Sequence, residues 1–419
     1  MFFDRKYTTD CHIYNMLETA PRHMSFHTPG HKAGKWDITE LSFSDNLADP
    51  KGVILRAQDD IACILGARKS FILTDGSTSG VLSMMHAARP QKLLFATAAH
   101  ESVYNACRLF SIEEVTIPNR TVGIIPQQPT ATEIESALER EKCDGVLLTS
   151  PDYYGNIADY EQIKAVCHRH GAILICDGAH GAHLHGTNKY AGNFCDMWVD
   201  GVHKSLPAMT QGAVVSAKTE EFSDRLEESV SLFRTTSPNY LIMASVEYAV
   251  KYPRMPKKEK KSEEIKRKYG AYENADWSKI VLFYGKDAKK ACAYIEGMGL
   301  YPEFCDGENI LFYLSPATPY RQLCILEKTL AGMGPMLKKA QSEVCLPGEK
   351  VKIERETEMI SLEDGEGRVS AANAGLFPPC VPVISCGKTI SKEDIERLKE
   401  AGSTYGMRDG KICVYVRTE

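Results

Sequence analysis

A histidine and a lysine, His203 and Lys204, stand side by side in the segment DGVHKSLPAMTQGA, residues 200–213. Adjacent basic residues are usually exposed to solvent. Here, however, residues 197–199 before the pair and 213–215 after it are apolar runs typical of buried strands. A lysine held between buried strands is a candidate for covalent chemistry, because its amine can condense with a carbonyl group. Lys204 is therefore the first candidate catalytic residue.

A second polar segment, GSTSG at residues 76–80, leads from an apolar run into the helical pattern VLSMMHAAR. The free amides at a helix start, together with the hydroxyls of Ser77 and Thr78, can bind an anion such as a phosphate. Serine and threonine also cap ordinary helices, so this motif alone does not distinguish the two roles.

A third segment, ILICDGAHGAHLHG at residues 173–186, brings Asp177, His180, His183 and His185 close together in sequence. A metal site needs three or four ligands that converge on one point, and no cysteine or glutamate completes the set nearby. We expect no metal here. A carboxylate at a strand end can instead bind a protonated heterocycle and keep it cationic, which is the role we predict for Asp177.

These pieces together match the needs of pyridoxal 5'-phosphate. Lys204 can form a Schiff base with the aldehyde, Asp177 can keep the ring nitrogen protonated, and Ser77 and Thr78 can hold the phosphate. His100, which follows the apolar run KLLFATAA, can stack on the ring. Nucleotide sites are excluded because no GxGxxG follows a strand, and CGKT at residues 386–389 lacks the first glycine of a phosphate-binding loop.

The elements that must position these residues lie between Ser70 and Ala217. Apolar runs alternate there with segments of helical periodicity, such as residues 131–142 and 158–171. This alternation is typical of βαβ units and of a mainly parallel sheet, in which ligands bind beyond the carboxyl ends of the strands. The expected strands are SFILT (70–74), KLLFAT (92–97), EEVTIP (113–118), GVLLTS (145–150), AILICD (172–177) and MWVD (197–200).

A lysine-rich stretch at residues 251–268 interrupts this pattern and reads as a solvated helix or linker. A second, smaller α/β set follows, with KIVLFYG, ACAYIEGMG and NILFYLSP. We therefore predict a cofactor-binding major domain over residues 1–250 with an N-terminal arm, a charged helix or linker over 251–275, and a smaller C-terminal α/β domain over 276–419.

Composition limits the class of protein further. The chain of 419 residues has a formal net charge of -5, which gives no reason to expect nucleic acid as a partner. No run approaches the length of a membrane span, and the N-terminal residues do not read as a secretory signal. Fourteen cysteines are scattered without a CxxC pair, as expected for reduced thiols. We expect a cytoplasmic protein with no membrane partner.

The motifs resemble those of the bacterial Orn/Lys/Arg decarboxylases, which use pyridoxal phosphate on the fold-type I scaffold related to aspartate aminotransferase. The resemblance implies an α/β large domain with a mainly parallel seven-stranded sheet and a smaller C-terminal α/β domain. The resembling segments occur in the family's order and are FHTPGHKAG (26–34), GSTSG (76–80), HESVYNA (100–106), SPDYYG (150–155), DGAHGAH (177–183), HKSLPAMTQGA (203–213), TTSPNY (235–240) and, more loosely, FPPCVPVISCGKTIS (377–391).

The resemblance implies a role for each matching residue. Lys204 would be the Schiff-base lysine, Asp177 the partner of the pyridine nitrogen and His100 the stacking ring. The cofactor-binding set implied by the family is Ser77, Thr78, His100, Asp177, His180, His203, Lys204 and Thr235. Because Thr235 would reach the phosphate of a neighbouring subunit, the resemblance implies a homodimer with the active site at the interface, and it leaves a higher oligomer open.

The implied reaction is the α-decarboxylation of arginine, lysine or ornithine, with arginine favoured because compact relatives often use it. Glu363 matches an acidic position of the family's C-terminal region and is a candidate to bind the substrate's cationic side chain. It is equally a candidate for an ordinary surface glutamate. Other pyridoxal phosphate lyases or aminotransferases, a weakly active or inactive paralogue that binds the cofactor, and a metal hydrolase remain as alternatives.

Three positions depart from the family's pattern. Gly178 stands where glutamate is common, Gly201 and Val202 replace a Ser-Thr pair before His203, and Lys388 follows Gly387 where glutamate is usual. The loss of one phosphate-binding hydroxyl at Gly201 is expected to weaken cofactor binding about 10- to 100-fold. These departures bear on the substrate and on the level of activity.

Overall fold

The computed structural model describes residues 3–21, 23–32, 36–334, 344–345, 356–377, 380–400 and 403–416. Its centre is a seven-stranded sheet in the order β1-β9-β8-β7-β6-β2-β3, in which β9 alone runs antiparallel to its neighbours. The mainly parallel seven-stranded sheet expected from the sequence is confirmed. The strands are β1 (Lys69–Leu73), β2 (Lys92–Ala96), β3 (Glu113–Ile117), β6 (Gly145–Thr149), β7 (Ile173–Asp177), β8 (Met197–Asp200) and β9 (Ala213–Ala217).

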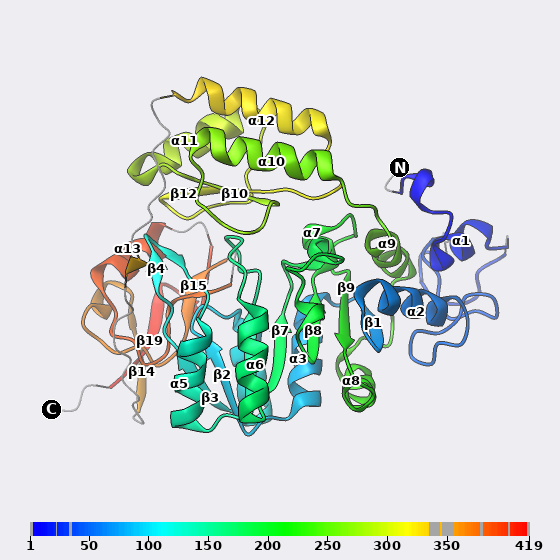
Figure 1. Ribbon diagram of the computed structural model, residues 1–419, viewed down its shortest axis with the longest axis horizontal. Coiled ribbons are helices and arrows are strands. Elements are labelled where there is room, and N and C mark those ends of the chain that lie inside the picture. The colour runs from blue at the N-terminus through cyan, green and yellow to red at the C-terminus, as the bar shows by residue number, and fades with distance from the viewer. Residues whose placement is uncertain are drawn as a thin grey trace.

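The strands of this sheet are apolar along their whole length because helices cover both faces. Leu93, Phe95 and Ile175 point into one core, whereas Leu94 and Leu174 point into the core on the opposite face. The covering helices on the first face are α3 (Gly76–Ala88), α4 (Glu101–Phe110) and α8 (Glu220–Phe233), and those on the second are α1 (His12–Thr19), α2 (Val53–Leu65), α5 (Ala131–Glu141), α6 (Tyr160–His170) and α9 (Tyr240–Val250). Figure 1 shows α5 and α6 in front of the sheet and α3 behind it.

The N-terminal helix α1 is fastened to α9 by a buried carboxylate. Glu247 is fully buried, and its two oxygens accept hydrogen bonds from the backbone amides of His12 and Ile13 at 2.6 and 2.8 Å. Lys251 neutralises this carboxylate at 2.9 Å and also contacts Asp60. A negative charge at the first turn of a helix is stabilised by the free amides there, so the start of the chain is held against the major domain.

A second unit packs above the carboxyl edge of the sheet (Figure 1). It contains the antiparallel strands β10 (Lys279–Phe283), β12 (Asn309–Tyr313) and β11 (Phe304–Cys305), with the helices α10 (Pro256–Tyr269), α11 (Ala288–Gly297) and α12 (Tyr320–Gly332). The lysine-rich stretch forms α10, whose Ile265 is buried in the same core as Ile280 and Ile310. Helix α10 therefore packs its apolar side against this core and carries its charged residues on the other side, as an ordinary amphipathic surface helix does.

The C-terminal residues form a third apolar core, separate from that of the second unit. It is built around Leu362, Ile384, Ile395 and Val414. The elements are β14 (Thr357–Ser361), β15 (Ala374–Leu376), β16 (Pro382–Ile384), α13 (Lys392–Glu400), β17 (Thr404–Tyr405), β18 (Met407–Arg408) and β19 (Lys411–Tyr415). The part of the chain after residue 250 thus contains two separate buried cores, whereas one smaller C-terminal domain over residues 276–419 was predicted. Helix α10, which lies in the predicted linker over residues 251–275, belongs to the first of these cores.

A short hairpin of the major domain reaches toward the C-terminal unit. It consists of β4 (Thr121–Val122) and β5 (Ile125–Pro126), and β4 also pairs with β13 (Val344–Cys345). All thirteen cysteines whose side chains the structure describes are free thiols. Within the part of the chain that the structure describes, no helix combines the length and apolar character needed to cross a membrane.

Candidate active site

Polar residues from four strand ends meet in a cavity of about 660 Å³ at the carboxyl edge of the large sheet. Ser77 follows β1, His100 follows β2, Asp177 ends β7, and Lys204 lies in the short helix α7 (Val202–Ser205) after β8. All four line the cavity. The convergence predicted from parallel strand order is therefore present, because the carboxyl ends of parallel strands share one edge.

The amine of Lys204 is paired with an imidazole. Its Nζ lies 3.3 Å from Nε2 of His180, a buried ring whose Nδ1 has no hydrogen-bond partner among the described residues. Burial lowers the pKa of Lys204, against the opposing attraction of Asp177 and Glu303. Burial also holds the pKa of His180 well below its usual range, and the positive charges of Lys204, Lys279 and His100 add to this effect. A neutral His180 can therefore accept a hydrogen bond from the Lys204 ammonium.

Asp177 is only 3% exposed, and its Oδ1 accepts a hydrogen bond from the amide of Ala179 at 3.2 Å. No cationic side chain forms an ion pair with it among the described residues. A buried carboxylate is costly unless a positive charge or further donors approach it. The geometry thus leaves Asp177 ready to receive a cationic group inside the cavity.

His100 caps helix α4 and is held in one orientation by that cap. Its Nδ1 accepts a hydrogen bond from the amide of Ser102 at 3.1 Å, so its ring face lines the cavity while the ring cannot turn freely. Burial lowers the pKa of His100, with Asp177 opposing and Lys204 adding to the shift. A neutral ring fixed at its edge is suited to stacking against a flat group.

The predicted phosphate-binding residues gather around the start of α3. Ser77 lines the cavity and Thr78 is exposed beside it, and neither hydroxyl has a hydrogen-bond partner among the described residues. Thr235 lies at the same place, because its amide donates to Asp75 Oδ2 at 3.2 Å. His203 is outside the cavity lining, and its Nδ1 donates to the carbonyl of Gly212 at 2.9 Å. Phosphate binding by these four residues therefore stays a prediction.

The other histidines of the DGAHGAHLH segment point to separate partners. His183 Nε2 is 2.8 Å from Asp276 Oδ1, and His185 Nδ1 donates to the carbonyl of Ala182 at 2.8 Å. Among the described residues, Asp177, His180, His183 and His185 do not form a group with ligand atoms close enough to share one ion.

Glu363, predicted to bind the substrate, is not brought to the cavity of its own chain. Its carboxylate is 63% exposed and lies 2.9 Å from the ammonium of Lys399. It is absent from the residues that line the cavity. Within its own chain, this glutamate takes part in a surface ion pair, and its substrate role stays a prediction.

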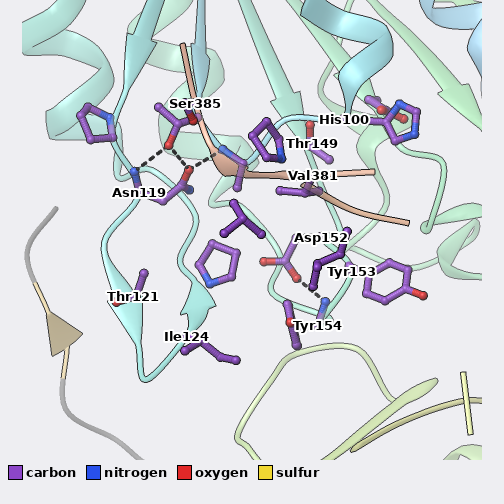
Figure 2. Close-up of a pocket in the computed structure, with 18 of the residues that line it drawn as sticks. His100, Asn119, Thr121, Ile124, Thr149, Asp152, Tyr153, Tyr154, Val381 and Ser385 are labelled. Carbon is purple, nitrogen blue, oxygen red and sulfur yellow. Dashed lines mark hydrogen bonds between the residues drawn. The ribbon is translucent and has the colours of Figure 1, made fainter. Parts of the chain in front are cut away.

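Several lining residues received no role from the sequence. Tyr153, Tyr154 and Asp152 come from the loop after β6, and Figure 2 shows them grouped on one side of the cavity, with Thr121 and Ile124 of the β4–β5 hairpin on another. The SPDYYG motif was the available signal for this loop. The C-terminal unit supplies a further wall that no local pattern marked, made of Leu376, Val381, Pro382, Val383, Ser385, Lys388, Thr389, Glu393 and Arg397.

Two departures from the family's pattern face each other. A Cβ atom at Gly201 would lie 2.5 Å from the carbonyl oxygen of Ala179, and a Cβ at Gly178 would lie 2.9 Å from the carbonyl oxygen of Val199. The ends of β7 and β8 therefore approach backbone to backbone, which larger residues would prevent. The missing hydroxyl at Gly201 is a consequence of this close packing rather than an isolated loss.

The third departure, Lys388, lines the cavity and binds Asp394 Oδ1 at 2.7 Å.

Comparison with known proteins settles the family. The model for the major domain of the Orn/Lys/Arg decarboxylases matches residues 35–283. The chain belongs to the Orn/Lys/Arg decarboxylase family. It is a pyridoxal phosphate-dependent amino acid decarboxylase of fold type I, as the motifs implied.

Individual relatives are distant but cover nearly the whole chain. The uncharacterized protein YaaO of Bacillus subtilis is 27% identical over 94% of this chain and 96% of its own. An arginine decarboxylase of Bacillus anthracis is 25% identical over 90% of each chain. Among solved structures, lysine decarboxylase A of Pseudomonas aeruginosa superposes with a TM-score of 0.76 at 16% identity, covering 97% of this chain and 80% of the other.

The residues present fit pyridoxal phosphate. An amine made less basic by burial, an unpaired buried carboxylate and a neutral ring line one cavity, with free hydroxyls at a helix start beside them. Each matches one part of the cofactor: the aldehyde, the ring nitrogen, the ring face and the phosphate.

We predict that Gly201→Ser, which restores a hydroxyl common in the family, destabilises the protein. The added Cβ must displace the Ala179 carbonyl, and overpacking of this kind costs about 1 to 3 kcal/mol. Denaturant unfolding and titration with pyridoxal phosphate measure both effects, and we expect a lower unfolding midpoint and weaker binding. Gly297→Ser is the control, since nothing lies within 4 Å of its Cβ position. A stable variant with tighter cofactor binding would contradict the packing argument.

Proposed function

We propose that this protein decarboxylates a basic amino acid at its α-carbon, with arginine as the favoured substrate. The observation that carries the proposal is the buried amine of Lys204 in one cavity with Asp177 and His100. Support for arginine comes from relatives named arginine decarboxylase, which match this chain over about nine-tenths of both lengths. Lysine and ornithine are the other candidates.

In this proposal Lys204 binds the cofactor covalently, Asp177 holds the pyridine nitrogen and His100 stacks on the ring. Ser77, Thr78 and His203 hold the phosphate. When bound, pyridoxal phosphate draws electrons from the substrate's α-carbon, so that the carboxylate can leave as CO2. Because burial lowers the pKa of Lys204, its amine loses a proton more readily than an exposed lysine does.

His180 is the residue placed to accept a hydrogen bond from that amine. Its Nε2 lies 3.3 Å from Lys204 Nζ, and its pKa is held low by burial, so the ring is neutral and can accept. We therefore assign His180 to the cofactor-binding set and give it the role of a neutral hydrogen-bond acceptor for Lys204.

A cationic substrate side chain needs an acidic group in the distal part of the cavity, and two carboxylates are available there. Asp152 is already saturated, since it accepts hydrogen bonds from the amides of Tyr154 and Asn156 and from the Asn156 side chain, and burial raises its pKa to about 6. Glu393 of α13 lines the cavity and forms no ion pair with the described residues. Glu393 is therefore the proposed acceptor.

We also propose that the protein is a homodimer whose active site lies at the subunit interface. The arm after α1 supports this, because Met24 and Phe26 are 84% and 92% exposed there. Exposed apolar side chains of this size are costly in water and suggest a partner surface. Thr235, beside the start of α3, is the residue proposed to reach the partner's phosphate site.

We predict that the purified chain, supplied with pyridoxal phosphate, releases CO2 from arginine and that Lys204→Ala abolishes both turnover and covalent attachment. Borohydride reduction followed by peptide mapping should place the label on Lys204. Lys218→Ala is the control, since burial lowers the pKa of Lys218 as well, yet it lies outside the cavity. CO2 from lysine or ornithine alone would change the substrate. Silence with every amino acid despite the label would indicate an inactive paralogue.

Glu393→Gln is expected to raise KM for arginine about 10- to 100-fold while kcat is retained. A charge-assisted hydrogen bond remote from the reacting carbon contributes about 1.5 to 3 kcal/mol to binding. Steady-state kinetics measure the split between KM and kcat. Glu396→Gln on the same helix is the control, because Glu396 is exposed and does not line the cavity. Equal kinetics for the two variants would exclude Glu393 as the acceptor.

Light scattering on the purified protein should give twice the 46.6 kDa of one chain. Replacing Met24 and Phe26 together by serine should raise the dimer dissociation constant at least about 100-fold, since burying each such side chain contributes about 1.5 to 3 kcal/mol. Tyr301→Ser, at an equally exposed position of the second unit, should leave the mass unchanged. A monomeric parent protein would refute the interface proposal.

A further inference from the structure

A second lysine is buried directly behind the active site. Lys279, the first residue of β10, has a fully buried side chain whose Nζ lies 3.2 Å from Asp276 Oδ2 and 3.1 Å from Ser278 Oγ. Asp276 is equally buried and contacts His183 through its other oxygen. This cluster joins the second unit to the segment that follows Asp177, and neither the motifs nor the proposed mechanism uses it.

The cluster is connected to the catalytic pair by one aromatic ring. The ammonium of Lys279 lies 3.3 Å from the ring centroid of Tyr313, at the end of β12. The same ring stacks on His180, with centroids 5.9 Å apart and an interplanar angle of 24°. Tyr153 closes the other contact of His180, edge to face at 5.2 Å. The imidazole that meets Lys204 is thus clamped between two tyrosines, one of which carries a buried cation.

We infer that Lys279 and Tyr313 are positioning residues for His180, which hold its imidazole against the Lys204 amine and keep that imidazole neutral. Tyr313 supplies the flat surface that sets the ring plane, and its hydroxyl donates to the backbone carbonyl of His180 at 3.4 Å. Lys279 fixes the Tyr313 ring through the cation–π contact, which is worth more when both partners are desolvated. The inference rests on the proposed roles of Lys204 and His180.

The charges that face His180 act in one net direction. Lys204, His100 and Lys279 disfavour its protonation, and among the described groups Asp276 opposes them. Burial is the largest cause of its lowered pKa. Lys279 itself keeps a pKa of about 8, because Asp276 offsets part of its burial, so its charge is present at neutral pH. The charge of Lys279 at neutral pH therefore helps to keep Nε2 of His180 available as an acceptor.

A salt bridge with a purely structural role would not need the contacts that join Lys279 to Tyr313 and Tyr313 to His180. Buried ion pairs are weak contributors to stability, because desolvation of the charges offsets their attraction. Lys261 shows the alternative within the same unit: its amine lies 2.6 Å from Glu327 Oε2, and no cation–π contact to a ring joins it to the catalytic pair among the described residues. The contact of Lys279 with Tyr313, and of Tyr313 with His180, is what distinguishes the two lysines.

The test uses the full-length protein loaded with pyridoxal phosphate and compares Lys279→Met, Tyr313→Leu and Tyr313→Phe with the parent chain. Deuterium exchange at the imidazole C2 position, followed by mass spectrometry with fragmentation, gives the titration midpoint of His180 separately from His183 and His185. Lys279→Met should raise this midpoint by about one pH unit, the size expected for a unit charge about 10 Å away at an effective dielectric constant of about 20.

Tyr313→Leu should speed exchange at His180, because the ring loses its cover, whereas Tyr313→Phe keeps the flat surface and should match the parent. Lys261→Met, which removes a lysine paired with Glu327, is the matched control and should leave His180 unchanged. If Lys279→Met does not fold, the comparison of Tyr313→Leu with Tyr313→Phe decides alone. Unaltered exchange at His180 in the folded Lys279→Met and Tyr313→Leu proteins overturns the inference. Absence of the borohydride label on Lys204 in the parent chain would instead overturn the proposed function.

Discussion

Removing one amine from water is the constraint around which the rest of the protein is arranged. The ammonium of Lys204 is disfavoured by burial, Asp177, Glu303 and Cys380 offset part of this effect, and the His180 imidazole lies within hydrogen-bond distance. Asp177 and His180 come from the end of β7 and the segment after it, whereas Glu303 comes from the second unit, so this environment forms only when the two units are packed together. Folding and reactivity are coupled at this point because the same contacts serve both.

The cavity beside that amine is shared among three units of the chain. The large sheet contributes the groups that meet the cofactor, whereas the C-terminal unit contributes the distal wall, including Lys388 and Glu393. The distal wall therefore carries charges of both signs, and Lys388 is occupied by Asp394. In the proposed function, the strand ends hold the cofactor and the distal wall selects the side chain of the substrate.

The glycines at 178 and 201 illustrate how a departure from a family pattern is explained by packing. Considered singly, each is a lost functional side chain. In the fold they lie against the carbonyl oxygens of Val199 and Ala179, so both belong to one close approach of two strand ends. In the proposed function, the start of α3 and His203 then carry more of the phosphate binding. Packing also explains the proposed role of Lys279. That role depends on the contact of its ammonium with the Tyr313 ring rather than on its ion pair with Asp276.

The sequence by itself determined the sheet and its reactive edge. Apolar runs and helical periodicity are local properties, and parallel strands bring their carboxyl ends together, so the order of residues along the chain is enough to place Ser77, His100, Asp177 and Lys204 in one site. Only the tertiary structure decided the rest. The ion pair of Glu363 with Lys399, the lining position of Glu393 and the path from Lys279 through Tyr313 to His180 join residues whose mutual distances depend on how separate units pack. Local patterns carry no information about such distances, because they are fixed by side-chain packing across units far apart in the chain.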